Sequence, residues 1–263
     1  MDDLGLFGPT SIAWRIHGDP SSLIGGLRAL LLQALNPLAM AVVAQSSNFA
    51  SDPWGRLQRT SDYVMTTTFG SSRAAQAQGA RIRALHAHIK GVDPVSGRVI
   101  RADDPELLAW VHNVEVDSFL AAYRRYGGRL SRTESDRYVA EMVSAAELVG
   151  LARADVPHDL AGLRNYLGRA TARLQPTPEA KRGFKVVMSP PLPPLVRPLW
   201  AIPATAAVAI LPARARRLYG IPWLPLTGAA VRPTTFALCR AMNVLLPGPP
   251  ILRDARERAA SAA

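Results

Sequence analysis

The segment from residue 21 to residue 48, SSLIGGLRALLLQALNPLAMAVVAQSSN, constrains the fold of this chain more than any other. It is apolar on nearly every side at helical spacing, and Pro37 interrupts it. A helix that is hydrophobic all round has to be buried, and proline breaks or kinks a helix. The segment therefore predicts a buried helix pair, or one kinked helix.

Start and stop signals predict helices along most of the remaining chain. Asp52-Pro53 and Asp104-Pro105 each place an N-cap residue before a proline that fits the first helical position. Ser131 and Glu134 form a capping box for a further helix. The expected helices cover residues 53–69, 72–89, 105–126, 132–151 and 159–173, and residues 91–106 predict a small hairpin. Without alternation of strands and helices, this pattern predicts an all-α fold.

The character of the sequence changes after residue 180. Thirteen of the 22 prolines lie beyond residue 181 and cut residues 181–263 into short helical pieces. We expect one domain over residues 1–263, with residues 8–180 as the main helical body and this proline-broken portion packed on it.

Most of the positive charge also lies in that C-terminal portion. Residues 181–263 carry twelve Lys and Arg against two acids, and so supply +10 of the formal net charge of +11. A basic surface of this kind suits nucleic acid, anionic lipid or the carboxylates of a cofactor, and a solvated arginine-rich surface explains it equally well. No recognisable nucleic-acid-reading helix is present, so specific nucleic-acid binding is not expected.

Several protein classes are disfavoured by the sequence. Cys239 is the single cysteine, which excludes an intrachain disulfide and a multi-cysteine zinc site, and its apolar surroundings favour a small core residue. The motifs of serine hydrolases, phosphate-binding loops and dinucleotide-binding folds are missing. The N-terminus shows no secretory signal, and the longest apolar stretch, residues 199–212, is too short to span a bilayer. We expect a cytoplasmic protein, with that stretch either in the core or at a membrane surface.

Two of the five histidines lie in the segment RIRALHAHIKG. Helical spacing places Ile82, Leu85 and Ile89 on one apolar stripe; His86 borders this stripe, and His88 faces the basic, solvent side. An inward imidazole on a helix suits axial ligation of haem iron. A core histidine hydrogen-bonded to the backbone explains the same pattern, and a zinc site centred on this helix is poorly supported because no further ligand follows at helical spacing.

A second group of polar residues lies on the preceding helix. Arg56 and Thr60 share a face at a spacing of four, and Arg59 lies beside them. A guanidinium near a hydroxyl can anchor a carboxylate or orient a bound substrate; a surface arginine and a partly buried threonine are the structural alternative. His112 is either a core residue or part of a pocket wall. His17 and His158 are expected near loops.

Four stretches, taken in order, resemble a known bacterial family. They are NPLAMAVVAQSSNFASDPWGRLQRTSDYVMTTTFG, IRALHAHIKG, DDPELLAWVHNVEVDSFLAAYRRY and ARARRLYGIPW, within residues 8–225. Each stretch is degenerate alone, but the ordered set is similar to MpaB-type oxygenases, a family that also contains the rubber-cleaving latex-clearing proteins.

This resemblance implies an all-α, globin-like fold around haem b, with O₂ as co-substrate. It makes His86 the axial iron ligand and matches Arg56, Arg59 and Thr60 to catalytic positions of the rubber-oxygenase branch. Arg83, one turn before His86, becomes a candidate partner for a haem propionate.

The sequence also departs from that branch. Where the branch has a lysine that can occupy the distal iron position, this chain has Arg59, a much poorer ligand because its guanidinium stays protonated. Residues 23–50 hold no acid that could match the branch's catalytic base. The rubber-cleavage mechanism therefore does not transfer intact.

Two functions follow as alternatives. The first is a haem-b-dependent oxygenase acting with O₂ on an apolar small molecule, lipid or isoprenoid-type substrate. The second is a non-catalytic helical carrier of haem or an apolar ligand that associates with anionic membrane through its basic C-terminal portion.

Overall fold

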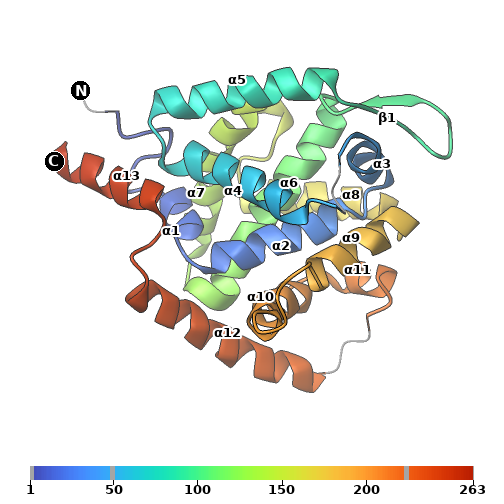
Figure 1. Ribbon diagram of the computed structural model, residues 1–263. Coiled ribbons are helices and arrows are strands. Elements are labelled where there is room, and N and C mark those ends of the chain that lie inside the picture. Colours follow the sequence, from blue (N-terminus) through green and yellow to red (C-terminus); the bar gives the residue numbers. More distant parts are fainter. Residues whose placement is uncertain (1–2, 48–50, 222–224, 263) are drawn as a thin grey trace.

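Helices form nearly all of the regular structure in the computed structural model, which describes residues 3–47, 51–221 and 225–262 (Figure 1). The N-terminal helices are α1 (Ile12–His17), α2 (Ser21–Gln33), α3 (Pro37–Ser46), α4 (Pro53–Phe69) and α5 (Ser72–His88). Two strands, β1 (Lys90–Val92) and β2 (Val99–Arg101), pair antiparallel as a short hairpin, with Gly91 opposite Ile100. The predicted all-α fold and the predicted hairpin are confirmed.

The second half of the chain continues the helical pattern. It comprises α6 (Pro105–Ala122), the π-helical turn η1 (Tyr123–Gly127), α7 (Arg132–Leu148), the short turn η2 (Arg153–Asp155), α8 (Leu160–Ala170), the short turn η3 (Thr171–Arg173), α9 (Pro178–Met188), α10 (Arg197–Ala209), α11 (Ala213–Leu218), α12 (Pro225–Leu245) and α13 (Pro250–Ser261). The expectation of short pieces after residue 180 was wrong for α12, which runs for 21 residues with Pro233 inside it.

The capping signals read from the sequence operate in the structure. Asp52 accepts a hydrogen bond from the backbone of Gly55 at 2.9 Å, and Asp104 caps α6 in the same way. Ser131 and Glu134 form the complete capping box of α7. These side chains satisfy backbone N–H groups that the first turn of a helix leaves without partners.

Helix α2 lies at the centre of the molecule, as its apolar sequence requires, and α3 lies beside the hairpin, with Ala39–Val42 buried (Figure 1). The two helices are bent by 101° at the break before Pro37, where Asn36 caps α3. Helix α2 packs most extensively along α6 and also contacts α9 and α10 (Figure 1). Within the described ranges, no single helix has the length and apolar character needed to cross a bilayer; α2 and α3 meet that criterion only when taken together as a bent pair.

One hydrophobic cluster joins the main body to the C-terminal portion. From the main body it contains Leu31 of α2, Leu35 just after α2, and Trp110 of α6. From the C-terminal portion it contains Val208 of α10 and Leu211, which follows α10. Because these side chains exclude water jointly, the C-terminal portion contributes to the same core.

Buried Arg28 adds a polar tie between α2, α6 and α10. Its guanidinium pairs with Asp117 at 2.7 Å and donates to Ser118 Oγ at 2.6 Å and to the carbonyl of Ile210 at 3.0 Å. A buried charge is tolerated when its donors find partners of this kind.

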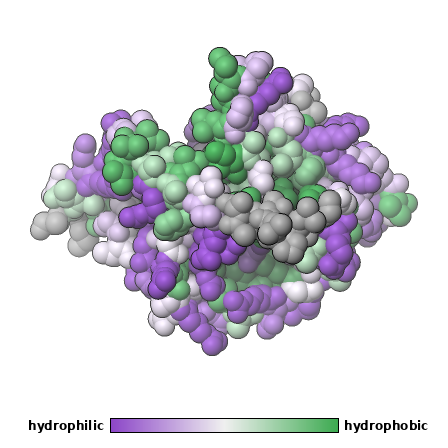
Figure 2. Space-filling view, turned by 90° about the horizontal axis from the view of Figure 1, so that it is seen from below, coloured by the Kyte–Doolittle hydropathy of each residue, from purple (hydrophilic) through white to green (hydrophobic). Residues whose placement is uncertain are grey.

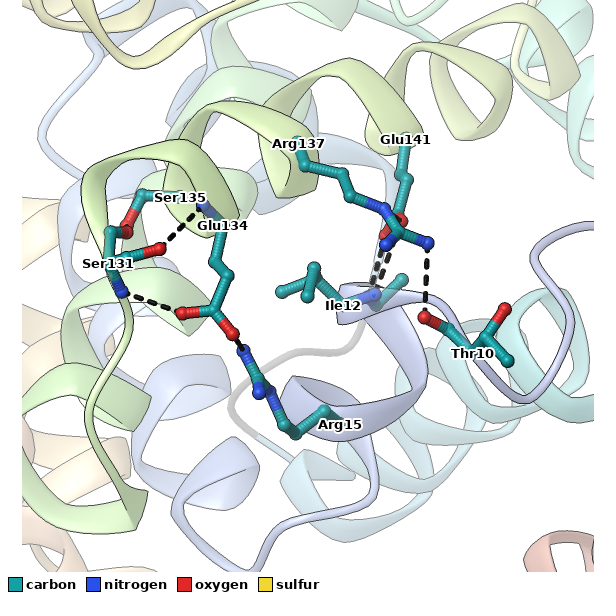
Figure 3. A network of polar contacts seen from close by, with 9 residues as sticks. Thr10, Ile12, Arg15, Ser131, Glu134, Ser135, Arg137 and Glu141 are labelled. Carbon is teal, nitrogen blue, oxygen red and sulfur yellow. Dashed lines mark hydrogen bonds and ion pairs between the residues drawn. The ribbon is translucent and has the colours of Figure 1, made fainter.

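Helix α1 is held on α7 by a polar network (Figure 3). The carboxylate of Glu141 accepts hydrogen bonds from the backbone of Ile12 and Ala13, at 3.2 and 2.9 Å. Arg137 pairs with the same carboxylate, and Arg15 pairs with Glu134. A carboxylate at a helix N-terminus is favourable because the helix dipole is positive there. This docking fixes His17, the last residue of α1, inside the molecule.

Candidate functional site

Helix α5 carries His86 and is fixed against α7 by two neighbouring contacts. A Cβ on Gly79 would lie 2.8 Å from the carbonyl oxygen of Leu148, so only glycine permits this approach of the two helices. One turn further on, Arg83 Nη1 donates to the same carbonyl at 2.6 Å. The register of α5 is thereby set one turn before His86.

His86 is half-buried, and its ring forms no hydrogen bond with any of the described residues. Its Nδ1 atom is buried and unpaired among the described residues. Burial lowers the pKa of His86, and the carboxylate of Asp103 opposes that shift. The imidazole is therefore favoured in its neutral form, the form that binds metals.

His88 lies on the other side of the same helix. It is exposed, and its Nδ1 contacts the carbonyl of Ala84 at 2.7 Å. The predicted separation of His86 and His88 is confirmed. The predicted apolar stripe is wrong at Leu85, whose side chain is 53% exposed.

The structure places the three candidate residues of α4 in different surroundings. Arg56 is half-buried and donates to Ser47 Oγ at 2.7 Å; burial, followed by the charge of Arg59, lowers its pKa. Arg59 is exposed and pairs with Asp52 at 3.3 Å. Thr60 is exposed and donates to the carbonyl of Arg56 at 3.0 Å. Arg56 is thus the inward member of the three, and Arg59 meets solvent.

A half-buried acid, Glu115 on α6, was missed by the sequence reasoning. Burial raises its pKa to about 7, and none of the described residues forms a hydrogen bond or ion pair with its carboxyl group. His112, one turn earlier on the same face, is half-buried, and burial lowers its pKa to about 4. The sequence feature that could have indicated Glu115 is its position, as an acid, in the middle of the apolar run WVHNVEVDSF.

Tyr63 shows that α4, α5 and α6 converge at this place. Its pKa is raised by burial and then by the nearby Glu115, and Arg83 acts in the opposite direction. Arg56 and Tyr63 share a face of α4, two turns apart. Helices α4 and α5 pack closely together, whereas neither packs closely along α6. Tyr63 thus lies near both Glu115 of α6 and Arg83 of α5, and Arg83 itself is exposed.

A chain of buried hydrogen bonds lies beside these groups. His17 Nδ1 contacts Thr68 Oγ1 at 2.7 Å, and its Nε2 contacts the hydroxyl of Tyr138 at 2.9 Å. Burial lowers the pKa of His17 to about 3, and burial together with Glu115 raises the pKa of Tyr138. The expectation that His17 lies near a loop was wrong, because it links α1, α4 and α7 in the interior.

The remaining candidates lie apart from this group. Cys239 is buried as predicted, and burial raises the pKa of its thiol to about 11. His158 is exposed and contacts the carbonyl of Arg153. In the part of the chain that the structure describes, no three His, Cys, Asp or Glu side chains are grouped to hold a metal ion by themselves.

Comparison with known proteins gives one match. No curated protein and no solved structure matches the chain. Residues 14–243 match the family described as "ER-bound oxygenase mpaB/B'/Rubber oxygenase, catalytic domain". The matched region contains α4, α5 and α6 and extends to α12. The chain therefore belongs to the mpaB and rubber oxygenase catalytic-domain family.

Proposed function

We propose that this protein is a haem-b-dependent oxygenase that uses O₂ to oxidise an apolar small molecule, lipid or isoprenoid-type substrate. The observation that carries the proposal is His86, an inward imidazole whose buried Nδ1 lacks a partner. Membership of an oxygenase family supports the reaction class.

The residues of the site fit a haem. His86 would hold the haem iron, because its Nδ1 is without a partner among the described residues and its ring is favoured in the neutral form. Asp103, whose charge acts on His86, is placed to influence the basicity of this ligand. Arg83 and Arg56, each of which also donates to a protein oxygen, would face the propionates. When bound, haem would supply the activation of O₂.

The chain's own residues would bind and orient the substrate and manage protons. Tyr63, His112 and Glu115 are half-buried residues of α4 and α6. Because the pKa of Glu115 is about 7, its carboxyl group can accept or release a proton near neutral pH. Glu115 is therefore a candidate for the catalytic base. In the rubber-oxygenase branch that base would fall within residues 23–50, which contain no acid in this chain.

Arg59 and Thr60 have a smaller part in this proposal than the family resemblance gives them. Both are exposed, and Arg59 would reach the interior only after separating from Asp52. Arg56 is the member of the three that we assign to orienting substrate or a propionate.

The absorption spectrum of the haem-reconstituted protein, oxidised and reduced, tests the proposal. We expect a Soret band in the wild type and in His88→Ala, which removes the exposed histidine of the same helix. His86→Ala should lose the band or shift it, because the axial ligand is gone. A wild type without a Soret band overturns the proposal. An unchanged band in His86→Ala refutes the ligand assignment.

Oxygen consumption separates an oxygenase from a carrier. With a panel of apolar substrates, the wild type should consume O₂ in an oxygen electrode, and Glu115→Gln should do so more slowly while keeping its Soret band. Haem binding without O₂ consumption over the whole panel would favour the non-catalytic carrier.

A further inference from the structure

Residues 189–199, with the sequence SPPLPPLVRPL, comprise the segment between α9 and α10 and the first residues of α10, and they form an apolar projection from the surface. Leu195 is 95% exposed and Leu199 is 60% exposed. Most of the prolines around them are exposed as well. Exposed aliphatic side chains grouped in this way mark an interaction surface. Figure 2, which shows the molecule from below, has hydrophobic side chains projecting between hydrophilic ones.

This projection is held in place by hydrogen bonds. Trp54 Nε1 donates to the carbonyl of Pro191 at 3.3 Å, and Arg197 Nε donates to that of Leu192 at 3.1 Å. Trp200 Nε1 donates to the carbonyl of Val187 at 2.9 Å. The leucines are therefore presented by a fixed backbone, which lowers the conformational cost of binding.

Two tryptophans lie at the base of the projection. The rings of Trp54 and Trp200 meet edge to face, with centroids 5.1 Å apart, and both side chains are half-buried. Tryptophan is favoured at the level of lipid headgroups, because one part of its ring system is apolar and its N–H needs a polar partner.

The positive charge near the projection indicates which kind of surface it would bind. Residues 180–200, which include the projection, hold four Lys and Arg and no acid. Arg182 and Lys185 line a hollow of about 520 Å³ on α9, together with Phe184 and Met188. Apolar side chains at a tip with cations behind it suit an anionic bilayer, in which the tip enters the acyl region and the cations meet phosphates.

We propose that residues 189–199 dock the protein on the surface of an anionic lipid membrane, with Leu195 and Leu199 inserted between the lipids and Lys185 and Arg197 at the headgroups. Docking of this kind is peripheral and needs no membrane-spanning helix. Trp54 is on the first turn of α4, which also carries Arg56, so the docked face adjoins the candidate site. The docking itself does not depend on the proposed oxygenase function.

Co-sedimentation with vesicles tests this proposal. Vesicles of phosphatidylcholine and phosphatidylglycerol in equal parts should bind the wild type, and pure phosphatidylcholine should bind it weakly. Because two aliphatic side chains are lost from the inserted tip, Leu195→Ser combined with Leu199→Ser should lower the affinity by at least about a hundredfold. The matched control is Val95→Ser combined with Val99→Ser, on the hairpin, where the exposures are 87% and 64%; it should bind like the wild type.

The contribution of charge is tested separately. Removing one cation at the headgroup level should weaken binding about fivefold, which is the expectation for Lys185→Gln. Lys90→Gln, on the exposed hairpin, is the control and should not change binding. Salt at 0.5 M should abolish the preference for anionic vesicles, because it screens these charges with a Debye length of roughly 4–5 Å.

The proposal would be overturned by a wild type that does not bind anionic vesicles. It would also be overturned if the Leu195/Leu199 double variant, with a native circular dichroism spectrum, bound these vesicles as tightly as the wild type. The third contrary result is sedimentation velocity showing that the same leucines hold two copies of the chain together in the absence of lipid.

Discussion

At the scale of single residues, buried titratable groups distinguish this interior from an ordinary apolar core. Glu115 has no ion-pair partner in the part of the chain that the structure describes, and burial raises its pKa to about 7. His17 is held neutral, with both ring nitrogens engaged. Burying a carboxylate without a partner costs stability whenever the group is charged. A site of this kind is typical of a functional position rather than of one selected for stability.

Glu115→Gln should remove a pH dependence of stability. The pKa of Glu115 is about 7 in the folded protein and 4.5 for the free side chain, so the folded state binds more protons between these values. The free energy of unfolding of the wild type should therefore decrease, relative to Glu115→Gln, as the pH rises from 5 to 8, by at most about 3 kcal/mol. Urea unfolding at four pH values in this range measures the difference.

Glu147→Gln is the control for this experiment, because Glu147 is exposed on α7. Its unfolding curves should follow those of the wild type at each pH. Parallel pH profiles for the wild type and Glu115→Gln would show that the carboxyl group of Glu115 is not shielded from water.

The sequence predicted part of the candidate site. The inward direction of His86 followed from helical spacing, because both faces of α5 are defined by local pattern. Glu115 and His17 were missed, because their burial depends on which helices pack over them, and no local pattern encodes that packing. Thr60 shows the converse: its spacing from Arg56 was read correctly, but the face they share turns partly to solvent.

At the scale of elements, the packing of α2 on α6 depends on one glycine of a pair. A Cβ on Gly25 would lie 2.7 Å from Phe119 Cδ1 and 2.9 Å from Phe119 Cα, whereas a Cβ on Gly26 would meet no atom within 4 Å. The two helices approach closely only because position 25 lacks a side chain.

Gly25→Ala and Gly26→Ala should therefore change stability in opposite directions. Gly25→Ala forces α2 and α6 apart and should cost about 1–3 kcal/mol. Gly26→Ala should stabilise the protein by about 0.5–1 kcal/mol, because alanine restricts the unfolded chain and favours the helix. Chemical denaturation of the two variants measures both effects. Equal effects of the two substitutions would contradict the close packing at Gly25.

Element boundaries were more predictable than element packing. Caps at Asp52, Asp104 and Ser131 are local hydrogen bonds, and the sequence placed each helix start correctly. The length of α12 was not predicted, since Pro233 lies inside the helix, where proline is normally a breaker. The sequence also could not predict which glycine allows the close contact of α2 with α6, because Gly25 and Gly26 are adjacent and nothing in the sequence distinguishes them.

At the scale of the whole molecule, charge and apolar surface are both concentrated in the C-terminal portion, which also completes the core. Helix α13 returns to the N-terminal region, where Leu252 and Ala255 pack with Trp14 and Phe69. Arg258 Nη2 donates to the carbonyl of Phe69 at 2.5 Å. Helix α13 is thus joined to α1 and α4 by these contacts, and the two ends of the chain lie on the same side of the molecule (Figure 1). The proposed docking segment, residues 189–199, therefore belongs to a C-terminal portion that shares the core of the main body.

Leu252→Ala should consequently lower the melting temperature of the whole protein. Loss of a buried leucine creates a cavity that costs about 2–5 kcal/mol, and in a chain of this size each kcal/mol lowers Tm by about 2–4 °C. Circular dichroism and tryptophan fluorescence should report one shared transition, lowered by about 5–15 °C. Leu246→Ala, at an exposed position just before α13, should leave Tm unchanged within about 1 °C because it creates no cavity. Two separate transitions, with only one of them moved by Leu252→Ala, would show that residues 181–263 unfold independently of the main body and would contradict a single domain.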